Sequence, residues 1–105
     1  MSWFYLIIAG AFEICWPLGF KLSQVTPHKF AWIAFSVAAM GLSGLFLWMA
    51  QKTIPMGTAY AVWTGIGAVG AFVIGIILFK DPATVLRIVS VALIVAGIVG
   101  LKIAG

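Results

Sequence analysis

The sequence predicts an all-α membrane protein with four transmembrane helices. Hydrophobic residues make up 65% of the 105 residues, charged residues make up only 8%, and the mean hydropathy is +1.25. A soluble domain of this size leaves too much of its surface in water to hide so much apolar area. The apolar residues also gather in four runs. Each run has about the 20 residues that a helix needs to cross the hydrocarbon layer of a bilayer.

We expect the four helices at residues 2–20, 30–50, 57–79 and 85–104, within a single domain that covers residues 1–105. Short polar breaks separate the helices, and no linker or low-complexity segment divides the chain. An even number of spans places both ends of the chain on one side of the bilayer. Because Lys and Arg occur near both faces, the positive-inside rule sets the orientation only weakly. Insertion in both orientations is therefore an open alternative.

Glu13 is the most informative residue of the first stretch, because it is the only Glu in the chain. An ionisable group at the centre of a spanning helix costs at least ~2.5 kcal/mol, so it usually faces the bundle interior and marks an ion or substrate path. Gly10 and Trp16 share the helical face of Glu13. Pro17 lacks the N–H that would bond the Glu13 carbonyl. We expect Gly10 and Pro17 to permit close packing or to act as a hinge.

Residues of the second and third stretches are available to surround this carboxylate. Tyr60, Trp63 and Gly67 share one helical face, and Ser43 lies at mid-depth of the second stretch. Ser43 has two interpretations, a bond to its own preceding turn or a bond to a carboxylate on a neighbouring helix. Gly65 and Gly67 belong to a run that matches the dinucleotide-binding pattern by chance, since no strand precedes it. These glycines predict a hinge or close packing.

The fourth stretch carries no charged residue at mid-membrane depth. Its small residues favour association with another helix, because they let two backbones approach closely. We expect this stretch to form the contact between copies of the chain, through Ser90, Leu93, Ile94 and Gly97.

The residue inventory excludes several kinds of chemistry. One His, one Cys and no Asp within a span predict neither a metal site nor a cofactor. The basic residues punctuate the ends of apolar runs, which is typical of membrane anchors rather than of nucleic-acid binding. One carboxylate among aromatic faces is suited to binding a cation. Since a low-dielectric interior favours the protonated carboxyl group, a cation and protons would compete for it.

The symmetry that a two-sided transport path requires predicts a second copy of the chain. Four helices enclose little space, and we find no convincing inverted repeat within the chain from which a two-sided transport path could be built. Two copies in opposite orientations would supply that symmetry. They would also bring two Glu13 carboxylates together, and such a pair titrates as a unit.

The whole chain resembles the small multidrug resistance family of bacterial inner-membrane transporters, and within it the guanidinium exporter subtype. The resemblance is carried by Lys21 and by two motifs, Ile8-Ala-Gly-Ala-Phe-Glu13-Ile-Cys-Trp16 and Pro55-Met-Gly-Thr-Ala-Tyr60-Ala-Val-Trp63-Thr-Gly65-Ile-Gly67-Ala-Val-Gly70. It implies an antiparallel, dual-topology homodimer that is not an enzyme. This dimer would exchange protons for guanidinium and small substituted guanidinium cations by alternating access. Both Glu13 carboxylates would form the site that Trp16, Ser43, Tyr60 and Trp63 line or orient.

Two departures from the family pattern bear on the substrate range. Pro17 stands where a small residue is usual, and Thr26-Pro27-His28-Lys29 replaces a loop that contains Gly and Phe. The nearest alternative is a promiscuous exporter of quaternary ammonium or aromatic cations. A second alternative is a proteolipid-like rotor subunit, although the chain lacks its two-helix repeat. A third is a structural subunit in which Glu13 is only a satisfied polar contact.

Overall fold

The computed structural model describes residues 1–104 and consists of four α-helices. Helix α1 spans Ser2–Val25, α2 Lys29–Ala50, α3 Met56–Phe79 and α4 Val85–Ala104. All four helices are long and apolar enough to cross a membrane. The prediction of an all-α protein with four spanning helices is therefore confirmed.

Prolines set several of the helix ends. Helix α1 continues beyond its expected end at residue 20, because the next helix-breaking residue is Pro27. A proline disfavours helical geometry in the residue before it, and Thr26 accordingly adopts an extended backbone with φ −125° and ψ 162°. Pro55 directly precedes α3. At the other end of α3, Lys80 has a left-handed backbone with φ 56°. Pro17 lies inside α1, which passes through it without interruption.

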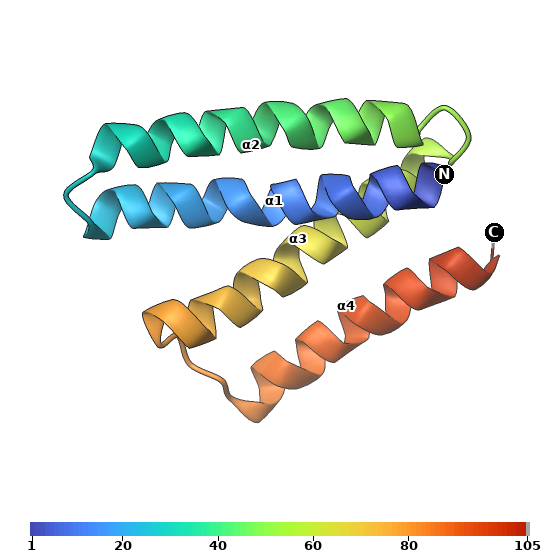
Figure 1. The fold of residues 1–105 in the computed structure, drawn as a ribbon. Helices are drawn as coiled ribbons and strands as arrows, with labels where there is room; N and C mark the ends of the chain where they lie inside the picture. The colour runs from blue at the N-terminus through green and yellow to red at the C-terminus, as the bar shows by residue number, and fades with distance from the viewer. Residues whose placement is uncertain (105) are drawn as a thin grey trace.

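Helices α1 and α2 lie antiparallel and side by side, while α3 crosses α1 at an angle (Figure 1). Helix α4 folds back along α3, and within residues 1–104 its backbone packs against no other helix. At its carboxyl end, the Lys102 side chain reaches the ring of Trp3 in α1. The α1–α3 crossing is consequently the inner contact of the bundle, and α4 lies at its edge.

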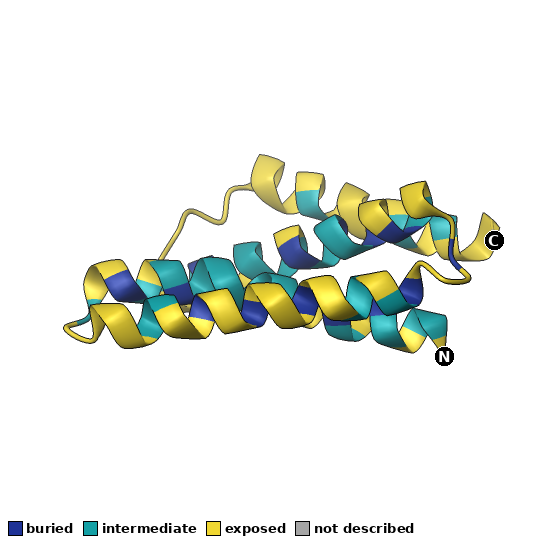
Figure 2. Ribbon diagram, turned by 90° about the horizontal axis from the view of Figure 1, so that it is seen from above, coloured by how far each residue is buried: buried dark blue, intermediate teal, exposed yellow. Residues whose placement is uncertain are grey.

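The buried core is small. It lies where the amino-terminal part of α1 (Leu6), the carboxyl end of α2 (Ala50) and the amino-terminal part of α3 (Val62) meet. No residue of Val85–Ala104 is buried, and α2 exposes most of its outer face (Figure 2). Exposed apolar area on this scale marks a surface that faces lipid or another protein. Most sides of the chain therefore face lipid or another protein.

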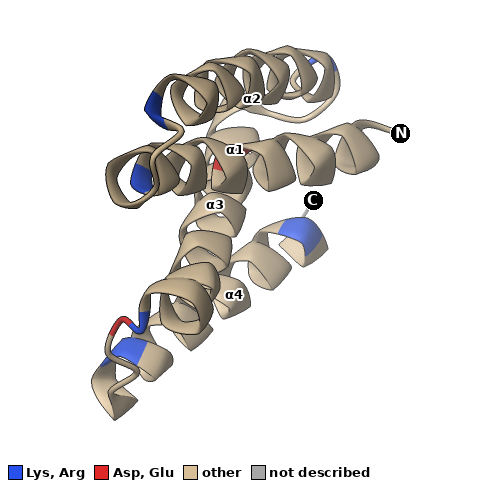
Figure 3. Ribbon diagram, turned by 60° about the vertical axis from the view of Figure 1, so that its left-hand side comes forward, with Lys and Arg blue, Asp and Glu red and all other residues tan. Residues whose placement is uncertain are grey.

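Basic residues lie near both ends of the bundle (Figure 3). Four of them place the charged group over an aromatic ring, as long side chains do when they extend from an apolar span toward its edge. The distances to the ring centroids are 5.9 Å for Lys21 on Phe79, 5.2 Å for Arg87 on Phe72, 4.6 Å for Lys52 on Trp48 and 4.9 Å for Lys102 on Trp3. Lys and Arg side chains are therefore anchored on aromatic rings at both ends of the bundle.

Candidate functional site

Glu13 lies near the middle of α1 and is partly buried. Its carboxylate accepts a hydrogen bond from the indole N–H of Trp16. The two residues are three positions apart, so their side chains meet on one face of the helix. Among residues 1–104, this indole is the only side chain that hydrogen-bonds the carboxylate. A neutral donor thus orients the carboxylate and leaves its charge available to a ligand.

Glycines bring α3 close to α1 at this point. A Cβ built on Gly67 would lie 2.5 Å from Cγ of Glu13, and one built on Gly10 would lie 2.6 Å from the Ile66 side chain. Gly65 faces α4 in the same way, with its built Cβ 2.8 Å from the Ile98 side chain. Each of these glycines lies at a helix contact where a larger side chain would have to displace its neighbour. The α1–α3 crossing therefore depends on glycine beside the carboxylate.

Ser43 of α2 connects α1, α2 and α3 through its hydroxyl group. It is 1% exposed, donates to the carbonyl of Ala9 at 2.7 Å, and accepts from the indole N–H of Trp63 at 2.8 Å. Both interpretations of Ser43 from the sequence were wrong, because its acceptor is neither its own helix nor a carboxylate. The small side chain of Ala9 lets α2 approach the α1 backbone closely enough for this bond. Ala9 lies one turn before Glu13, so the bond is next to the carboxylate but not on it.

Tyr60 lies at the outer edge of the site. The residue is 57% exposed, and its ring packs against the ring of Trp63, with the centroids 5.6 Å apart and the planes tilted by 52°. Within the described residues, its hydroxyl hydrogen-bonds no other group. The single chain thus forms two neighbouring clusters, Glu13 with Trp16 and Ser43 with Trp63 and Tyr60. It does not bring the hydroxyls of Ser43 and Tyr60 onto the carboxylate.

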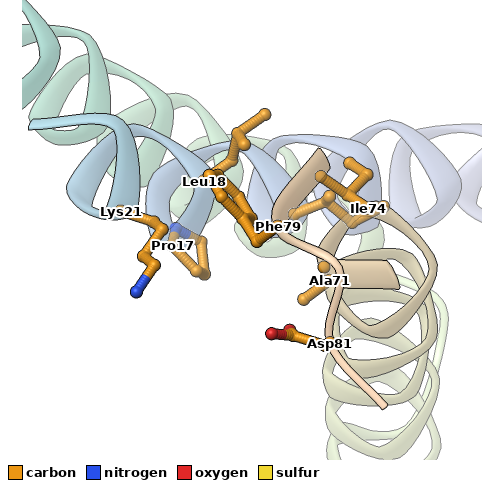
Figure 4. A pocket seen from close by; sticks show the side chains of 9 residues that line it. Pro17, Leu18, Lys21, Ala71, Ile74, Phe79 and Asp81 are labelled. Atoms are coloured by element: carbon orange, nitrogen blue, oxygen red, sulfur yellow. The ribbon is translucent and has the colours of Figure 1, made fainter. Parts of the chain in front are cut away.

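A partly open cavity of about 250 Å³ lies between the carboxyl-terminal halves of α1 and α3 (Figure 4). Apolar side chains form most of its lining, and Pro17 is one of them. Lys21 and Asp81 lie on opposite walls. The backbone N–H of Asp81 donates to the Gly75 carbonyl at 3.1 Å, which holds the start of the α3–α4 loop at this wall. Pro17 therefore faces open space beside the turn that carries Glu13.

The expected contact residues of α4 all lie on its surface. Leu93 is 68% exposed and Ile94 37%, and the Ser90 hydroxyl donates to its own helix at the Leu86 carbonyl over 2.8 Å. A Cβ built on Gly97 meets nothing within 4 Å, whereas the Ile94 side chain is 3.4 Å from one built on Gly65. Ser90, Leu93 and Gly97 thus lie on the uncovered side, and Ile94 turns partly toward α3.

Ser36 was not predicted as a site residue. It is fully buried on α2, and its hydroxyl donates to the Trp16 carbonyl at 2.9 Å. A signal was present in the sequence, because Ser36 and Ser43 lie two helical turns apart in an otherwise apolar stretch. This spacing places both hydroxyls on the face that meets α1.

Four helices long enough to span a membrane, with one indole-bonded carboxylate near the middle of α1, define a small multi-pass membrane protein with an ionisable group within a span. Residues 1–94 match the family model described as Small Multidrug Resistance protein, and the chain belongs to this family. It is 48% identical to a guanidinium exporter of Salmonella typhimurium and 49% identical to one of Escherichia coli, over 98% of this chain and 97% of each relative. It is also 48% identical to a guanidinium exporter of Yersinia pestis, over 99% of both chains.

These comparisons confirm the family that the sequence motifs indicated. Four spanning helices and the family together make the chain a multi-pass protein of the bacterial inner membrane. The relatives are named as exporters, in agreement with the expectation of a transporter rather than an enzyme.

Proposed function

We propose that this protein exports guanidinium cations in exchange for protons and that Glu13 binds both. The observation that carries the proposal is the bond from the Trp16 indole to the Glu13 carboxylate. A carboxylate in the middle of a membrane-spanning helix is costly unless it has a function, and here its bonded partner is neutral. Relatives named guanidinium exporters, 48–49% identical over nearly the whole chain, support the choice of substrate.

Guanidinium suits such a site on chemical grounds. The cation is planar, permanently charged and weakly hydrated, and its N–H groups form two parallel hydrogen bonds with one carboxylate. Aromatic faces attract it through their negative ring surface. Trp16 holds one edge of the Glu13 carboxylate. On α3, Trp63 lies about one helical turn and Tyr60 about two turns from Gly67, the residue that contacts Glu13. The free carboxylate edge would take the cation, and the rings would cover its faces.

Exchange follows from competition for one group. A protonated Glu13 carries no charge and loses its attraction for guanidinium, while a bound guanidinium excludes the proton. Binding of the cation on one side of the membrane releases the proton there. The loaded site then opens to the opposite side, where protons displace the cation from Glu13, and it returns protonated, so an inward proton gradient drives outward guanidinium transport.

The second part of the proposal is an antiparallel, dual-topology homodimer that works by alternating access. The uncovered outer face of α4 and the half-exposed Tyr60 ring are surfaces that a second copy would cover. Basic residues at both ends of the bundle leave little preference for one orientation. Opposed copies would place their two Glu13 carboxylates in one site.

A promiscuous exporter of quaternary ammonium cations is the second candidate. The cavity of about 250 Å³ beside Pro17 favours it, because apolar walls near the carboxylate would accept bulkier substituents. Quaternary ammonium cations have no N–H donors, so the carboxylate would attract them by its charge alone and form no hydrogen bonds with them.

Transport currents from purified protein in proteoliposomes test the proposal, because the two Glu13 carboxylates of the proposed dimer would exchange two protons for each guanidinium and so move net charge across the membrane. We expect guanidinium to evoke currents, a tetraalkylammonium cation to evoke none, and Glu13→Gln to abolish the guanidinium response. Asp81→Asn is the matched control, because Asp81 is the other acidic residue and lies outside the helices. Equal currents with both cations would favour the promiscuous exporter. Substantial proton-coupled currents from Glu13→Gln would exclude Glu13 as the shared binding group.

A further inference from the structure

We infer that Ser36 is a positioning residue that holds the turn of α1 carrying Glu13 and Trp16. The inference rests on the proposed function in one respect only, which is that the Glu13–Trp16 pair binds the cation. Its geometric basis is the hydrogen bond of 2.9 Å from the Ser36 hydroxyl to the Trp16 carbonyl.

The bond belongs to a paired arrangement between α2 and α1. Ser36 donates to the Trp16 carbonyl, and Ser43 donates to the Ala9 carbonyl at 2.7 Å. The two donors are seven residues apart on α2, and the two acceptors are seven residues apart on the antiparallel α1. Both serines are buried, with exposed fractions of 0% and 1%. The two bonds therefore fix the register of the helices on either side of Glu13.

The sequence of α1 weakens this turn. Pro17 has no N–H, so the Glu13 carbonyl lacks its normal helical partner and the turn loses one internal bond. Bonds from neighbouring helices commonly hold such turns in membrane proteins. Gly19 provides the space, because a Cβ at this position would collide with the Ser36 hydroxyl oxygen. The turn is therefore weakened by Pro17, and Gly19 leaves room for the Ser36 hydroxyl to bond it.

The consequence for the site is that the Trp16 backbone is tied to α2 while its indole N–H is directed to Glu13. Without the Ser36 hydroxyl, this turn is free to rotate or shift against α2. The indole would then hold the carboxylate less firmly, although every group that touches the ligand is still present. Ser36 thus acts through Trp16.

The direct test is the environment of Trp16 in the full-length protein labelled with 5-fluorotryptophan. The Trp16 fluorine resonance is assigned by its loss in Trp16→Phe. We expect Ser36→Ala to shift or broaden this resonance and Ser23→Ala to leave it unchanged. Ser23 is a matched control, because it is buried and donates to a carbonyl of its own helix, that of Phe20, at 2.6 Å.

An identical Trp16 resonance in the wild type and in Ser36→Ala would overturn the inference, as would an equal response to Ser23→Ala. If Ser36→Ala does not yield folded protein, Ser36→Cys replaces it. A thiol has nearly the same shape as the hydroxyl side chain but is only a weak hydrogen-bond donor. The same resonance shift is expected for this variant, and its absence would equally overturn the inference.

A double-mutant cycle on guanidinium binding supplies the functional readout. We expect Ser36→Ala to weaken binding about fivefold in the wild type, the effect of losing one hydrogen bond, and by less than about twofold in a Trp16→Phe background. Equal losses in both backgrounds would mean that Ser36 does not act through Trp16. If the wild type binds no guanidinium while its Trp16 resonance responds to Ser36, the proposed substrate fails and the positioning role stands.

Discussion

Gly67 of α3 lies directly against Glu13 of α1, such that a Cβ built on the glycine would be 2.5 Å from Cγ of the glutamate. This contact lies at the crossing of the two helices, next to the bond from the Trp16 indole to the carboxylate. A movement of α3 along α1 would therefore change the surroundings of the carboxylate at once.

Substitution of Gly67 by Ala tests the contact itself. The added methyl group must displace the middle of the Glu13 side chain, because overpacking is relieved by shifts of neighbouring atoms. We expect Gly67→Ala to weaken guanidinium binding by about tenfold, measured by calorimetric titration of the protein in detergent. Gly57→Ala is the control on the same helix, since a Cβ there meets nothing within 4 Å. Equal affinities for the wild type and Gly67→Ala would show that the contact does not position the carboxylate.

Substitution of Trp16 by Phe separates the indole N–H from the aromatic face. A hydrogen bond to a charged acceptor contributes roughly 1.5–3 kcal/mol. We therefore expect Trp16→Phe to weaken guanidinium binding by at least about tenfold. The ring of the variant keeps the edge-on packing against Phe20, whose centroid is 5.7 Å from that of Trp16. The titration described above measures the effect, and an unchanged dissociation constant would remove the indole from the site.

Substitution of Gly97 by Leu tests α4 as the contact between copies. A Cβ at Gly97 meets nothing within the chain, so the single chain accommodates the substitution. At a close helix–helix contact, a large side chain keeps the backbones apart. We expect light scattering in detergent to give a dimer mass for the wild type and a monomer mass for Gly97→Leu. Gly44→Leu, at an equally open position on α2, should keep the dimer mass. A dimer mass for Gly97→Leu would place the contact elsewhere.

The spanning helices could be predicted from the sequence because each is a long apolar run, and length and hydropathy are local properties. The expected end of α1 at residue 20 is five residues too early, because Lys21 does not end the span. A single Lys at the end of a span extends along the helix with its charge directed outward, and here it lies over the Phe79 ring. The helix therefore continues until Pro27 makes further helix unfavourable.

Glu13 was conspicuous as a single carboxylate in an apolar run, and Trp16 was placed on its face by helical spacing. The hydrogen-bond partners of Ser43 and Ser36 are on other helices. These bonds therefore depend on how the packed helices are rotated and aligned, and the residue pattern of a single helix does not predict that. Helical spacing also placed Tyr60 beside Trp63. It did not reveal that Tyr60 is more than half exposed in the single chain.

The central claim is that guanidinium and protons compete for Glu13. The most direct measurement is the proton release that accompanies guanidinium addition to purified protein in weakly buffered solution, at a pH where the site still holds protons. We predict that guanidinium releases protons from the wild type, that Asp81→Asn releases the same amount, and that Glu13→Gln releases none. Saturable guanidinium binding without proton release, or proton release that persists in Glu13→Gln, would contradict the claim.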